Sequence, residues 1–189
     1  NPFKLNISFL LILALLALFL FQSSNMGVAD YAFELGKDIG LVNNEISNLL
    51  TIANIISISG GILVYVIGTK YGRTVPLCIG FLVSAIFTYL LHYSENITIY
   101  FIANTVTGIA WAFVIPYVLG LCASFDKHGQ MAALAGFISK VGLATGPLVG
   151  SLVILDYGFD LILNLATIAL IIAAAIIGYS SAKQERATT

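Results

Sequence analysis

The sequence predicts an all-α polytopic membrane protein with six transmembrane helices, and three observations support this fold class. Apolar stretches cover residues 6–28, 46–68, 75–93, 97–123, 130–154 and 159–180. Their lengths match the ~20 helical residues that cross a hydrocarbon core of about 30 Å. Only 9% of the residues are charged, against ~25% in soluble domains. One charged residue, Lys140, lies deep inside a stretch. We therefore expect one bundle over residues 1–182 and a polar tail over 183–189.

Short polar segments separate the six stretches in order. The first stretch turns polar over residues 22–25, and a connection over 29–45 leads to the second. A basic glycine turn over 68–74 joins the second stretch to the third, and residues 94–96 join the third to the fourth. Residues 125–129 and 156–158 provide the last two turns. Six spans place both termini on the same side of the membrane.

The distribution of basic residues predicts the orientation. Six of the eight lie on the side of the termini: Lys4, Lys70, Arg73, Lys127, Lys183 and Arg186. Because cytoplasmic loops are enriched in lysine and arginine, we expect cytoplasmic termini. The net charge of −1 gives no indication of a nucleic-acid partner. The sequence shows no nucleophile motif, phosphate loop or metal-ligand cluster, so we predict neither an enzyme nor a bound cofactor or metal.

A weak internal repeat has an offset of 86 residues. Residues 60–72 align without gaps on 146–158, with matching glycines at both ends and a matching tyrosine. Three spans separate the copies, which puts them on opposite sides of the membrane. This is the relation expected of a 3+3 inverted repeat.

The fourth span carries a polar and aromatic stripe. Tyr100, Asn104, Thr107 and Trp111 follow helical spacing and share one face. Such a stripe favours either hydrogen bonds between helices or the wall of a cavity that binds a solute. The polar run over residues 22–25 offers a similar surface on the first span.

The fifth span combines a glycine face with the buried cation. Gly142, Gly146 and Gly150 recur every four residues, and Pro147 lies among them. Small residues allow close helix packing in membranes, and proline permits a bend, so this face is a packing seam, a hinge or both. Lys140 lies about 15 Å into the span, near the midplane. Because an isolated lysine there is costly, we expect a solute, an acid outside this chain or snorkelling to offset its charge.

Two of these motifs resemble the major facilitator superfamily of secondary transporters. The turn Lys70-Tyr-Gly72-Arg73 is similar to the cytoplasmic loop motif of that family, although Thr69 and Thr74 replace its acidic and last basic positions. The segment from residue 115 to 150, with its glycine and proline helix, is similar to the fourth and fifth spans of the C-terminal half. The resemblance covers essentially the whole chain. It implies that the chain is the C-terminal half of a twelve-helix fold.

The resemblance also implies a function and roles for residues. A small solute would be transported across a plasma or bacterial inner membrane by alternating access, with a proton as the candidate coupling ion. The solute would contact Gln22, Asn25, Asn104, Thr107 and Trp111, and Lys140 would bind an anionic group or an acid of the N-terminal half. Lys70 and Arg73 would latch the cytoplasmic side. The alternatives are a non-transporting receptor or assembly subunit on the same fold, a six-span channel and an intramembrane enzyme.

Overall fold

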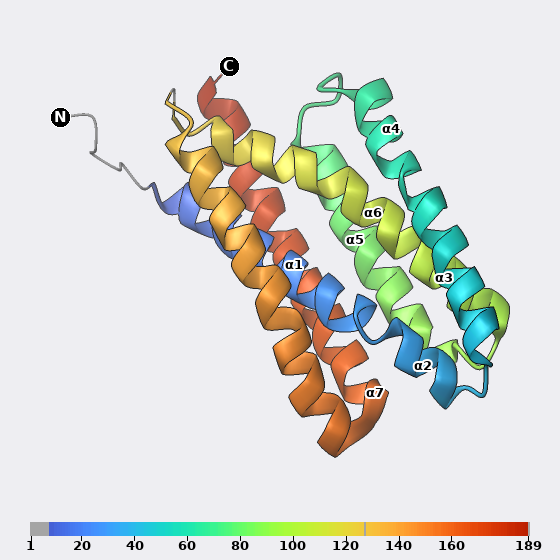
Figure 1. Cartoon of the computed structure of the whole chain (residues 1–189). Helices are drawn as coiled ribbons and strands as arrows, with labels where there is room; N and C mark the ends of the chain where they lie inside the picture. The colour runs from blue at the N-terminus through green and yellow to red at the C-terminus, as the bar shows by residue number, and fades with distance from the viewer. Residues whose placement is uncertain (1–7, 127, 189) are drawn as a thin grey trace.

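Seven α-helices and one 3-10 helix form the part of the chain that the structure describes, residues 8–126 and 128–188 of a computed structural model (Figure 1). The helices are α1 (Phe9–Ala29), α2 (Ala32–Asp38), α3 (Asn43–Ser57), α4 (Ser59–Ile67), α5 (Thr74–Leu90), the 3-10 helix η1 (Leu91–Tyr93), α6 (Ile97–Ala123) and α7 (Gln130–Thr188). Lys4, Lys127, the expected start of the first span at residue 6, and the end of the tail at Thr189 lie outside the described residues.

Five helical segments are long and apolar enough to cross a membrane. They are Phe9–Ala29, Asn43–Ile67, Thr74–Tyr93, Ile97–Ala123 and Gln130–Ala187. The chain is therefore a multi-pass membrane protein. The last segment contains 58 residues, far more than the ~20 that one crossing requires.

Helix α7 consists of two helices that meet at Gly158. Gly158 has φ 73° and ψ −174°, a conformation that side chains with a Cβ rarely adopt. The chain reverses there, and Figure 1 shows the orange and red parts of α7 turning back on each other. Each part has the length of a membrane crossing.

Helix α1 packs along both parts of α7 and forms the centre of the main core. Leu11, Leu18 and Phe21 on α1 have no exposed surface, and the Phe21 and Phe81 ring centroids lie 4.5 Å apart. The Ser180 hydroxyl near the end of α7 donates a 2.7 Å hydrogen bond to the Leu10 carbonyl. A second buried cluster, which includes Leu35 and Leu163, lies toward the other end of α1. These contacts fix α1 between helices that are distant in sequence.

Helices α3 and α4 lie at the edge of the bundle. Only 11% of their most apolar window is buried, compared with 39–44% in the other four segments. They contact α6 where both sides are small: a Cβ placed on Gly60 would lie 2.9 Å from the Ala112 Cβ. Their outer face exposes large apolar side chains, among them Ile55, Ile62 and Tyr65.

Candidate functional site

Three helices meet in a chain of hydrogen bonds centred on Gln22. The Trp111 indole N–H on α6 donates to the side-chain oxygen Oε1 of Gln22 over 2.7 Å. The Gln22 amide then donates to the Ser139 hydroxyl on α7 over 2.6 Å. Gln22 is 1% exposed, whereas Trp111 is 39% exposed. A fully buried amide therefore fixes an indole that still presents part of its surface.

The polar stripe on α6 divides between two environments. Tyr100 is completely buried, and its hydroxyl donates to the Ala32 carbonyl over 2.7 Å. Asn104 and Thr107 are partly exposed, and each donates to a carbonyl of its own helix. This leaves Asn104, Thr107 and Trp111 as the surface part of the stripe.

Asn25 lies apart from the Gln22 group. Its amide donates to the Phe21 carbonyl over 2.8 Å, and its side-chain oxygen accepts a 2.7 Å hydrogen bond from the Ser84 hydroxyl on α5. Both residues are buried, and Ser84 has no exposed surface. The sequence predicted Asn25 beside Gln22 on a solute surface, but the structure directs its side chain into the contact between α1 and α5.

Lys140 follows Ser139 on α7 and is exposed. It has no hydrogen bond or ion pair with any residue that the structure describes. Phe137 and Leu148 lie on the same side of α7 and are 64% and 63% exposed. A cation near the middle of a membrane segment thus lies on an otherwise apolar face, next to a residue of the Gln22 group.

The glycine face of α7 packs against α1 with almost no space between the backbones. A Cβ on Gly142 would lie 2.8 Å from the Gln22 Cβ, and a Cβ on Gly150 would lie 2.9 Å from the Gly27 carbonyl oxygen. At Gly146, an added Cβ would meet the Ser23 carbonyl and would lie 2.7 Å from the Gly27 nitrogen. These three glycines therefore form a close seam with α1.

Pro147 lies within the same seam. Its carbonyl oxygen accepts a 2.8 Å hydrogen bond from the Tyr31 hydroxyl. This bond ties the residue after Gly146 to the segment that follows α1, so the seam is held by a polar contact as well as by packing.

The basic turn before α5 binds a carboxylate from the end of α7. The Arg73 backbone N–H and the Thr74 hydroxyl both donate to Glu185, the latter over 2.7 Å. Gly72 has φ 69°, and a Cβ there would lie 2.7 Å from a Glu185 carboxylate oxygen. Sequence reasoning missed Glu185, because its distance from the turn along the chain gave no signal. Lys70, in contrast, is exposed.

The environment of Glu185 favours its charged form. Glu185 lies in the polar segment beyond the apolar part of α7. Partial burial raises the pKa of its carboxyl group, but hydrogen bonds from Arg73 and Thr74, together with the Arg73 charge, outweigh burial. The pKa of Glu185 is therefore below its ordinary value of 4.5.

A sequence model described as the Major Facilitator Superfamily matches residues 10–188. A search of curated proteins found no match to this sequence. Among the described residues, no group of three or more His, Cys, Asp or Glu side chains could hold a metal ion.

Proposed function

Because the chain belongs to the Major Facilitator Superfamily, we propose that it is the C-terminal six-helix half of a transporter that moves a small solute by alternating access. Two crossings by α7 bring the total to six, which supports a 3+3 inverted repeat. The partner is an N-terminal six-helix half of the same protein. We propose that the protein lies in a plasma membrane or a bacterial inner membrane. Both termini of this segment would then face the cytoplasm.

The observation that carries the proposal is the indole held by Gln22. Trp111 is fixed by a 2.7 Å hydrogen bond and yet is partly exposed on a membrane helix. A fixed aromatic face can stack on a solute with little loss of side-chain entropy. Asn104 and Thr107 extend this surface by one to two turns of α6, and Asn104 uses its amide N–H on its own helix, so its oxygen can accept from a solute.

Lys140 supplies the charge of the proposed site. No described residue neutralises it, and ions at such depth require a partner. Its place beside Ser139 puts it within one residue of the Gln22 group. We propose that it binds an anionic group of the solute, or an acid of the N-terminal half when the solute is absent.

The α1–α7 seam supports a mechanism in which the half moves as one body. Backbones in such close contact would clash if they slid past each other and would lose their packing contacts if they separated. The exposed face of α7 would then meet the N-terminal half, and rocking between the halves would expose the site to each side in turn.

Measurements of uptake by the full-length protein test the proposal. They cover a panel of anionic and neutral solutes, with and without an imposed proton gradient. Lys140→Met should weaken the uptake of one anionic class at least about tenfold, the loss expected for a charge-assisted hydrogen bond. Lys183→Met, at an exposed lysine near the C-terminal end of α7, is the matched control. Both variants must reach the membrane in native amounts.

A second pair of variants tests the aromatic surface. Trp111→Ala should reduce uptake, whereas Tyr179→Ala, at a 53% exposed aromatic on α7, should not. Equal uptake by native and Trp111→Ala proteins would remove Trp111 from the site. Absence of uptake for every solute by the native protein would favour the receptor or assembly subunit, in which these hydrogen bonds serve the fold alone.

A further inference from the structure

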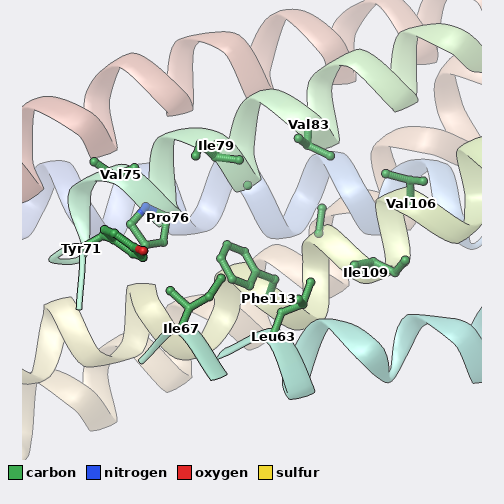
Figure 2. A pocket seen from close by; sticks show the side chains of 12 residues that line it. Leu63, Ile67, Tyr71, Val75, Pro76, Ile79, Val83, Val106, Ile109 and Phe113 are labelled. Atoms are coloured by element: carbon green, nitrogen blue, oxygen red, sulfur yellow. The ribbon is translucent and has the colours of Figure 1, made fainter. Parts of the chain in front are cut away.

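An apolar groove runs between α4, α5 and α6, away from the proposed solute site. Figure 2 shows side chains from the three helices pointing into a shared space. Its volume is about 490 Å³, within the ~300–1,000 Å³ range of ligand pockets. Helix α4 and helix α5 each pack on α6, which forms the floor of the groove. Principal lining residues are Leu63, Ile67, Val75, Ile79, Val83 and Phe113.

The groove and the solute surface occupy different faces of α6. Val106, Ile109 and Phe113 line the groove, whereas Asn104 and Trp111 belong to the solute surface. At ~100° per residue, the centres of the two sets lie roughly 180° apart around the helix. The groove is therefore a separate site rather than an extension of the first.

The shape and chemistry of the groove match a hydrocarbon chain parallel to the helices. Val75, Ile79 and Val83 follow one another along α5, a rise of about 12 Å at ~1.5 Å per residue. This is most of the depth of one leaflet, about 15 Å. Among the described residues that line the groove, Tyr71 alone has a polar side-chain atom, so the groove offers a polar solute almost nothing to bind. Val75 and Ile79 are 52% and 55% exposed, which leaves the groove open to the bilayer.

A basic turn lies at one end of the groove. Tyr71 lines the groove and is 70% exposed, and Lys70 precedes it in the turn between α4 and α5. Lys70 forms no side-chain hydrogen bond or ion pair with the residues described in the structure. Arg73 differs, because the Glu185 carboxylate lies beside it. Since the turn joins two membrane-crossing segments, it lies at a membrane surface, where lipid headgroups lie.

From this arrangement we infer that the groove binds one phospholipid with an anionic headgroup. One acyl chain lies along Val75, Ile79 and Val83, and the headgroup phosphate contacts the Lys70 ammonium and the Tyr71 hydroxyl. Charge complementarity at the turn selects an anionic lipid, and the apolar walls retain its chain. The bound lipid fills the space between α4 and α5, and so supports the most weakly buried part of the bundle.

Native mass spectrometry of the full-length protein in mixed micelles tests this inference. Dioleoyl-phosphatidylglycerol is the anionic probe, and dioleoyl-phosphatidylcholine, with the same chains, is the zwitterionic control. The native protein should retain one phosphatidylglycerol in preference to phosphatidylcholine. Lys70→Gln should reduce that preference about fivefold, the effect of one basic side chain at an anionic surface. Lys183→Gln, which removes an exposed lysine elsewhere, should leave it unchanged.

A second variant pair tests the acyl-chain site independently of charge. Ile79→Trp should fill the groove and reduce retention of both lipids, whereas Leu82→Trp, at an exposed α5 residue outside the groove, should not. Equal retention by the native and Ile79→Trp proteins would overturn the inference, as would equal retention of the two lipids by the native protein. Lack of any retained lipid would also overturn it. That result would favour a groove that the N-terminal half of the protein covers. None of these results depends on solute uptake.

Discussion

Replacing Gly146 with alanine should weaken the bundle, because the α1–α7 seam has no room for a methyl group. The added Cβ would meet the Ser23 carbonyl and would lie 2.7 Å from the Gly27 nitrogen, well inside the 3.4 Å at which ordinary contact begins. Both obstacles are backbone atoms, so no side-chain rotation can relieve the clash. Overpacking of this kind costs about 1–3 kcal/mol.

Gly136→Ala is the matched control for this substitution. Gly136 lies in the same helix, and no described atom would lie within 4 Å of its added Cβ. Both substitutions gain the same helix propensity, about 1 kcal/mol, so the difference between the variants isolates the clash. Gly146→Ala should therefore be about 1–3 kcal/mol less stable than Gly136→Ala, a difference of several degrees in Tm. Thermal unfolding of the purified full-length proteins measures it, and equal Tm values would refute the close seam.

Two further predictions concern polar contacts between helices. The pKa of Glu185 is lowered on folding, so its charge stabilises the fold above the ordinary pKa of 4.5, and this contribution is lost as the pH falls through the lower, folded value. Glu185→Gln should therefore lower Tm at pH 7 and have less effect as the pH falls below 4.5; a gap independent of pH would exclude the charge as its cause. Asn25→Leu, Ser84→Ala and the double variant should show a coupling of about 1 kcal/mol in unfolding free energy. Strict additivity would mean that the 2.7 Å bond between Asn25 and Ser84 contributes nothing.

The helical segments could be predicted from the sequence because bilayer thickness sets their length. Helix α6 covers the residues expected for the fourth span, and the chain reverses at Gly158, where a polar turn was expected. The interruption at Ile58, between α3 and α4, could not be predicted. The backbone angles of Ile58 are themselves helical. The residue at the interruption therefore gives no sequence signal of a helix break. Helix α2 was also not expected as a separate element.

The site was less predictable, because side-chain direction depends on contacts between distant helices. Composition placed Gln22 and Asn25 in one polar run, yet their side chains bond to different helices, Gln22 to α6 and α7 and Asn25 to α5. Three residues of a helix separate side chains by about 60°, enough to place them in different contacts. The binding of Glu185 to the turn at Arg73 spans more than a hundred residues and has no local pattern.

The two faces of the first part of α7 explain how a close seam and a charge with no partner among the described residues occur in one helix. The glycine face fixes α7 to α1. Through the hydrogen bonds of Gln22 with Ser139 and Trp111, it also fixes the position of Trp111 along the axis of α7. Lys140, one residue from Ser139, cannot shift along the axis without breaking that seam. Its only freedom is in its own side chain, so a partner must approach the lysine rather than the reverse. A charge held at fixed depth by packing fits the proposed site, in which movement of a second body would let the same lysine meet the solute from either side of the membrane.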